Sequence, residues 1–494
     1  MSDTAASYKQ ILKSFSIIGS ASVINILIGL VRTKFIAVLL GPTGIGLISL
    51  YSGLMSTATT VASMGIGITG TRQIAEALSK DNERVLAVVR RAMFWGVVLL
   101  ACAGALVVWS LREVLAVQVL GGVEHAPVVG WLALGVALSV AGASQGALIQ
   151  GMRRIGDMAR LSVFGSLLNT LLGVALLWQW GQVGLVAFVL IGPLSSFVLG
   201  YWYVSRMPKL VTSPIVMREI AHQWQTLLRL GVPFMGAGLV GALVQLWIRV
   251  EVGNTLGTKA LGQFQAAWVI SMQYIGFILG AMGADYYPRL TSLIHDHKAA
   301  TRLVNEQTEI ALLLSAPIFI GMIGLTPWVI QVLYSPAFAP AAAVLRWQVL
   351  GDVLKVASWP LGFIILAKGD GKTFFLVETL TFLLMGGLIA VLSNSVGLQI
   401  TGIAFLLSYV ILLPLLYWLA KRSIGFQWQL PVVILFLSIL ILCIIVFILS
   451  SLYWWGAGIA VISSLIFGIY TITRLASLSS VVSHLRRFAT IGQK

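Results

Sequence analysis

Residues 13–39, KSFSIIGSASVINILIGLVRTKFIAVL, form one long apolar run that identifies the chain as a membrane protein. Apart from Lys13 at its start, the run carries only two charges, Arg32 and Lys34. A helix of about 20 apolar residues is enough to cross a bilayer. A charge at the bilayer centre costs about 2.5–3.5 kcal/mol even on the insertion scale, so embedded cations persist mainly for function. The run therefore predicts a spanning helix that serves an anionic ligand.

The composition of the whole chain supports a polytopic membrane protein. Of its 494 residues, 59% are hydrophobic and 10% are charged, whereas a soluble domain carries about 25% charged residues. The runs are too long for barrel strands, so we expect an all-α fold with about 14 transmembrane helices. The predicted spans lie near 13–39, 44–70, 88–110, 127–150, 158–179, 183–204, 228–256, 262–288, 306–330, 341–367, 372–393, 397–420, 429–451 and 453–473.

The distribution of basic residues predicts the orientation. The net charge is +16, but most of the 32 Lys and Arg fall on loops that share one side, and the opposite loops keep only Arg112 and Lys259. The positive-inside rule then places both termini in the cytoplasm. The basicity thus reflects topology rather than nucleic-acid binding. We expect a multi-pass protein of the bacterial cytoplasmic (inner) membrane.

An internal repeat predicts the domain organisation. One shift of the chain against itself pairs Leu40-Gly41 with Leu256-Gly257, and Gly46 with Gly262. Six helices per unit insert the same way up, and such parallel repeats enclose a transport site between them. We expect a six-helix lobe at 1–204, a cytoplasmic linker at 205–227, a second six-helix lobe at 228–420, and two additional helices with a tail at 421–494.

The first helix of each predicted lobe carries a polar stripe that includes an arginine. Asn25 shares a helix face with Arg32, and Gln245 shares a face with Arg249. Arginine suits phosphate, since its planar fork binds two oxygens at once. The alternative is that these arginines snorkel to the headgroups. Lys34 points away from Arg32, so at most one of the two faces a given cleft.

The stretch RWQVLGDVLKVASW at 346–359 is the second cluster of embedded charge. Asp352 and Lys355 are adjacent on the helix surface. They form either a local pair that supports packing, or a pair that opens for a substrate anion or a proton. Arg346 lies nearer the outer end on the opposite face. Glu378, early in the next span, is the candidate for proton or cation coupling. We expect Arg346 and Lys355 to join Arg32, Lys34 and Arg249 as substrate-binding cations of the cavity.

These residues resemble a known transporter family. The segment WQVLGDVLKV at 347–356 is similar to the Wzx-type O-antigen flippases of the multidrug/oligosaccharidyl-lipid/polysaccharide (MOP) exporter superfamily, and the turn LGPTGIGL at 40–47 is a looser match. The resemblance implies two six-helix bundles around a cavity with alternating access. It implies an undecaprenyl-diphosphate-linked oligosaccharide as substrate, with an O-antigen polymerase and a chain-length regulator as partners. Arg32 resembles a cavity arginine of lipid II flippases.

Two other function classes stay open at this point. A cation-coupled multidrug antiporter of the same superfamily should carry carboxylates in its cavity, whereas the embedded charges of the first half are Arg32 and Lys34. A membrane glycan polymerase or ligase would need a large outer loop, whereas the loops at 110–127 and 253–262 are short. The sequence shows no catalytic triad, phosphate loop or metal spacing. We therefore expect a transporter without a cofactor, coupled to protons, sodium or the membrane potential.

Overall fold

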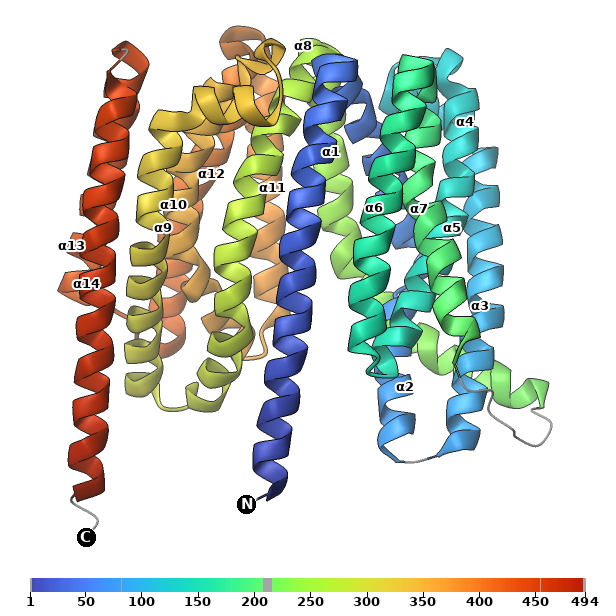
Figure 1. Ribbon diagram of the computed structural model, residues 1–494, viewed down its shortest axis with the longest axis horizontal. Coiled ribbons are helices and arrows are strands. Elements are labelled where there is room, and N and C mark those ends of the chain that lie inside the picture. Colours follow the sequence, from blue (N-terminus) through green and yellow to red (C-terminus); the bar gives the residue numbers. More distant parts are fainter. Residues whose placement is uncertain (1, 81, 208–215, 454, 492–494) are drawn as a thin grey trace. The chain divides into compact units, whose positions relative to one another are not determined.

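The computed structural model describes residues 2–80, 82–207, 216–453 and 455–491, and within them every regular element is a helix (Figure 1). By its internal contacts the chain divides into residues 1–262 and 263–494. The helices of the first unit are α1 (Ser2–Ser63), α2 (Ile66–Ser79), α3 (Glu83–Ser110), α4 (Arg112–Leu115), α5 (Ala126–Gly151), α6 (Ile155–Trp180), α7 (Leu185–Ser205) and the first part of α8 (Met217–Leu293). The second unit holds the rest of α8, α9 (His297–Leu333), α10 (Ala341–Ala367), α11 (Gly371–Val396), α12 (Ile400–Ile424), α13 (Leu430–Leu452) and α14 (Gly456–Ile491). Short 3-10 or π turns lie at 116–120, 123–125, 181–184, 336–338 and 397–399.

The helices are long and apolar enough for a multi-pass membrane protein. Nine helical regions of the described chain meet the length and hydropathy of a membrane span, or ten with the bent pair near the start of α8. Three of these regions have 45, 51 and 54 residues, and each is long enough for two crossings of about 20 residues. The prediction of an all-α, polytopic fold is confirmed.

Glycines explain why α1 and α8 each contain two predicted spans. The backbone of α1 breaks at Gly41 (φ 62°, ψ −168°) and that of α8 breaks at Gly257 (φ 86°, ψ 161°). Only glycine adopts these angles readily, because it has no Cβ. The two breaks fall at the positions that the internal repeat pairs, and Pro42 reinforces the first of them.

The second half of α1 packs closely against the first part of α8, within the first unit. A Cβ on Gly46 would overlap the Thr258 carbonyl oxygen, and a Cβ on Gly262 would overlap the Pro42 carbonyl oxygen. The contact is reciprocal, as in a two-fold interface. Gly46 of α1 meets the residue that follows the break in α8, and Gly262 of α8 meets the residue that follows the break in α1. The two backbones therefore touch where side chains would keep them apart.

In the second unit, α10 is the central helix and packs against α9 and α12. α14 also packs along α9, where Thr471 Oγ1 donates to the Leu313 carbonyl at 3.0 Å. That carbonyl lacks its usual helical partner because Pro317, four residues later, has no N–H. Arg474 adds an ion pair to Glu309 at 3.1 Å. The helix that carries Asp352 and Lys355 is therefore enclosed by its neighbours.

The predicted lobes at 1–204 and 228–420, the linker at 205–227 and the additional segment at 421–494 remain predictions. Residues 208–215 of that linker lie outside the described part of the chain.

Candidate substrate and coupling site

Asp352 is completely buried on α10 and is held by α8 of the same unit. Its Oδ2 accepts hydrogen bonds from Ser271 Oγ at 2.7 Å and from Tyr274 Oη at 2.5 Å. Its Oδ1 has no hydrogen-bond partner within the described residues. A carboxylate can accept both donors on one oxygen and still offer the other to a ligand or a proton.

Lys355 lies one turn further along α10, and its ammonium group forms no ion pair with a carboxylate of the described residues. Its Nζ lies 3.7 Å from Met272 Sδ, and 5.7 Å from the ring centres of both Phe405 and Tyr409. None of the ion pairs in the described chain includes Lys355. Ring faces attract a cation at this range without neutralising it. Lys355 therefore keeps its charge available for an incoming anion.

Glu378 brings a third charge near this cluster from α11. Asp370 caps the start of that helix, since its carboxylate accepts the Thr373 N–H at 3.0 Å and the Thr373 hydroxyl at 2.6 Å. These bonds lower the pKa of Asp370 in the turn outside the span. Glu378, about two turns further on, is half-buried and interacts electrostatically with Lys355, as does Asp352. The structure thus brings three of the predicted residues together.

Arg346 contacts carbonyl groups rather than an open cavity. Its Nε donates to the Ile323 carbonyl at 3.1 Å, and its Nη2 donates to the Ser450 carbonyl at 3.0 Å. Pro327 leaves the Ile323 carbonyl without its backbone donor, and Thr326 Oγ1 also donates to it at 3.3 Å. This geometry favours a role in joining α9, α10 and the end of α13.

The first unit holds the other predicted cations, all half-buried. Gly53 makes room for Arg249, because a Cβ there would lie 2.8 Å from Arg249 Nη1. Arg32 and Arg249 make no hydrogen bond or ion pair with the described residues. Their donors are therefore available to an external anion.

The polar neighbours of these arginines behave differently from one another. Asn25 Nδ2 donates to Ser162 Oγ on α6 at 2.7 Å, which ties α1 to its neighbour. Gln245 is half-buried with no hydrogen bond to the described residues, whereas Lys34, also half-buried, does interact with a neighbour. Asn25 thus supports packing, and Gln245 keeps a free amide beside Arg249.

Sequence reasoning missed Ser271 and Tyr274, the two donors to Asp352. They are about 80 residues away from it in the chain and follow no motif. Their spacing of one helical turn, facing a span with a buried acid, is the only signal that the sequence offers. Within the described residues, no group of three or more His, Cys, Asp or Glu side chains could hold a metal ion.

The chain matches known membrane transporters in sequence and in fold. A model of the family described as "Polysaccharide biosynthesis protein" matches residues 35–343. The lipid III flippase of Escherichia coli (strain K12) is 24% identical over 383 residues, which cover 74% of this chain and 87% of that protein. Among solved structures, the lipid II flippase MurJ in an inward closed conformation has a TM-score of 0.68 at 13% identity, covering 93% of this chain and 98% of its own. An inward-facing multidrug resistance MATE family transporter of the MOP superfamily has a TM-score of 0.67 at 17% identity, covering 81% and 94%.

These matches define the class of the protein. The fold is that of the MOP superfamily, and the chain is a transporter rather than an enzyme. The family match extends over more than half of the sequence, so the chain belongs to the polysaccharide biosynthesis protein family. The resemblance to MOP-type flippases that residues 347–356 indicated is confirmed.

Proposed function

We propose that the chain is a flippase that moves an undecaprenyl-diphosphate-linked oligosaccharide, such as an O-antigen repeat unit, from the cytoplasmic to the periplasmic leaflet of the inner membrane. The observation that carries this proposal is Lys355, an embedded cation with ring faces and a thioether around it instead of a carboxylate. Arg32 and Arg249 supply two more cations whose side chains have no hydrogen-bond or ion-pair partner among the described residues. A diphosphate headgroup is the anion that such dispersed cations suit, while the polyprenyl tail stays in lipid.

Energetics support outward export of an anionic headgroup. An inside-negative membrane potential favours outward movement of negative charge by about 2.3 kcal/mol per charge per 100 mV. The carboxylates of Asp352 and Glu378 offer a second route, in which a proton or sodium ion is exchanged as the transporter alternates its access. Asp352 Oδ1, which is buried without a hydrogen-bond partner among the described residues, is the oxygen that would bind such an ion.

The test is export in a strain that lacks the chromosomal gene. Cells with Lys355→Ala should accumulate lipid-linked oligosaccharide in the cytoplasmic leaflet and lose surface polysaccharide. The matched control is Lys372→Ala, which removes an exposed lysine from the start of α11. Normal polysaccharide in the Lys355 variant at normal protein levels would contradict the proposal.

A multidrug antiporter is the second candidate, and the buried carboxylate of Asp352 is the observation that favours it. An antiporter of cationic drugs should protect the same strain against several toxic cations. The flippase proposal expects no such protection and expects the trapped glycan lipid instead. The same strain also tests the expected partners, an O-antigen polymerase and a chain-length regulator, by cross-linking in the membrane.

A further inference from the structure

A cavity of about 590 Å³ lies at the start of two helices of the first unit, and its lining includes none of the residues of the proposed transport site. The first turns of α3 supply Arg84, Val85 and Val88. The first turns of α8, with Val216 just before them, supply the remaining lining residues, which are Arg218, Glu219, His222 and Gln223. Its volume falls within the range of about 300–1,000 Å³ that is typical of small-molecule sites.

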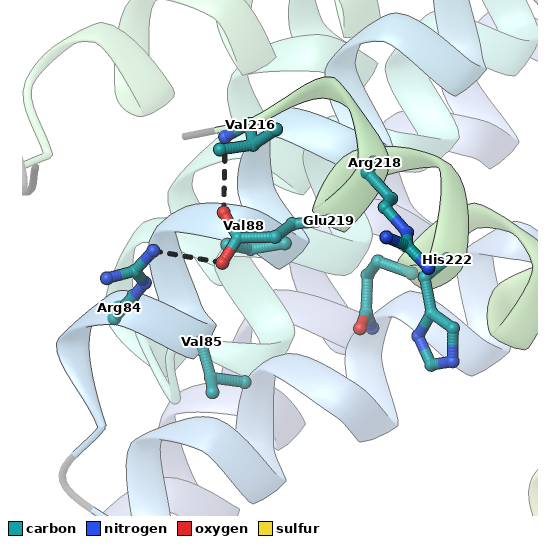
Figure 2. A pocket seen from close by; sticks show the side chains of 8 residues that line it. Arg84, Val85, Val88, Val216, Arg218, Glu219 and His222 are labelled. Carbon is teal, nitrogen blue, oxygen red and sulfur yellow. Dashed lines mark hydrogen bonds and ion pairs between the residues drawn. The ribbon is translucent and has the colours of Figure 1, made fainter. Parts of the chain in front are cut away.

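One ion pair fixes part of the cavity wall. Arg84 Nη2 donates to Glu219 Oε1 at 3.0 Å, and Glu219 Oε2 accepts the Val216 N–H at 3.2 Å (Figure 2). Both oxygens of Glu219 are therefore engaged. Its charge is matched by Arg84, so it adds little repulsion toward an anion in the cavity.

The other basic groups of the cavity are not engaged in this way. Figure 2 shows Arg218 and His222 close together on α8, on the side of the pocket away from Arg84. They are one helical turn apart, so their side chains share a face. Neither side chain makes a hydrogen bond or ion pair with the described residues, and the one bond of His222 outside the helical ladder is at its backbone carbonyl, which accepts from Thr226 Oγ1 at 3.1 Å. The cavity therefore keeps a net positive charge with unused N–H donors.

Apolar side chains accompany these donors. Val85, Val88 and Val216 line the cavity, and Val216 and the next residue in the chain, Met217, are 58% and 73% exposed. Large exposed aliphatic groups beside arginine, where an apolar span begins, are the combination that a lipid headgroup and the top of its acyl chain require. A free anion such as inorganic phosphate has no hydrocarbon chain and would make no apolar contact with these aliphatic side chains.

We propose that this cavity binds the phosphate group of a membrane lipid, with Arg218 and His222 as the donors and the aliphatic side chains against the lipid chain. Arginine suits this ligand because its fork can bind two phosphate oxygens at once. Two lipids could supply the phosphate, an anionic phospholipid of the bilayer or the polyprenyl diphosphate that we propose as the transported substrate. The phosphate group is the chemistry that they share.

The experiment measures lipid binding to the full-length protein in detergent. The probes are a short-chain phosphatidylglycerol, a short-chain polyprenyl diphosphate and, as a zwitterionic control, a short-chain phosphatidylcholine. The variant is the double substitution Arg218→Gln with His222→Gln. The matched control is Arg302→Gln, which removes an exposed arginine that is paired with Glu306 in the other unit.

We expect at least one anionic lipid to bind the double variant about tenfold more weakly, as the loss of a charge-assisted hydrogen bond implies. Weakening for phosphatidylglycerol alone assigns the site to a bilayer lipid, and weakening for the polyprenyl diphosphate alone assigns it to the substrate. Equal affinity of wild type and variant for both anionic lipids would overturn the proposal, and so would an equal loss for phosphatidylcholine. A thermal unfolding curve tests whether the double variant is folded. If the double variant is unfolded, the single substitution Arg218→Gln is used in its place. Phosphatidylglycerol binding should be the same in Lys355→Ala as in wild type, because Lys355 is not among the residues that line this cavity. That comparison separates failure of this site from failure of the proposed export function.

Discussion

The charges of Asp352 and Lys355 should stabilise each other even though no ion pair joins them. The residues are three apart on α10, which places their Cβ atoms about 5–6 Å apart. At an effective dielectric constant of about 20, two unit charges about 5.5 Å apart attract each other by about 3 kcal/mol. Removing either charge alone should therefore destabilise the protein by about 3 kcal/mol or more, because the other is left buried and uncompensated.

A double-mutant cycle with Lys355→Met and Asp352→Asn measures this interaction. Methionine keeps the length of the side chain, and asparagine keeps an acceptor for Ser271 and Tyr274. We expect the double variant to be more stable than the sum of the single effects predicts, by about 2–3 kcal/mol in equilibrium unfolding in detergent. Export should be lost whenever Lys355 is replaced, whatever the stability. Additive stability effects would refute the reasoning, since Lys355 would then have no electrostatic link to Asp352.

Three further predictions concern other parts of the chain. Gly46→Ala should reduce the amount of folded protein and its export activity, because the new Cβ would overlap the Thr258 backbone. Gly29→Ala is the control and should change neither, because the space around Gly29 is open. Quantitative immunoblots measure the protein, and polysaccharide assays measure export. Arg346→Ala should lower stability by about 1–3 kcal/mol in thermal unfolding, because it removes the hydrogen bonds from Arg346 to the Ile323 and Ser450 carbonyl groups. A stable variant without export would contradict that structural role. Reporter fusions at Gly121 and Lys259 should give periplasmic signals, and cytoplasmic signals there would reject the predicted topology.

The sequence alone was enough to predict an all-α membrane fold, because every helix that crosses the bilayer has to be apolar along its length. A span of about 20 apolar residues can be identified from a short stretch of sequence, and so can the glycine that ends it. The repeat also pointed to Gly41 and Gly257, and the structure breaks both helices there. The helix–helix contact at Gly46 and Gly262 required coordinates, since a glycine in a sequence does not reveal which backbone approaches it.

The candidate site could be predicted only in part. The pattern along α10 identified Asp352 and Lys355 and placed Glu378 as a coupling candidate, because embedded charge is rare enough to stand out. It did not identify Ser271 and Tyr274, whose hydroxyl groups are ordinary in a membrane helix. Nor did it predict the contacts of Arg346, which depend on where prolines of another helix leave carbonyl groups exposed.

The two prolines of α9 have a consequence for how the protein could be shortened. Pro317 leaves the Leu313 carbonyl without a donor from α9, and Thr471 of α14 supplies one. Pro327 removes the backbone donor of the Ile323 carbonyl, which accepts instead from Thr326 of α9 and from Arg346 of α10. An unsatisfied carbonyl in lipid costs several kcal/mol. Truncation after residue 420 would therefore leave α9 with an unpaired group in the hydrocarbon region and Arg346 without its acceptor at Ser450. The last two helices are thus a structural part of the second unit, and a minimal version of this transporter would have to replace Pro317 before it could dispense with them.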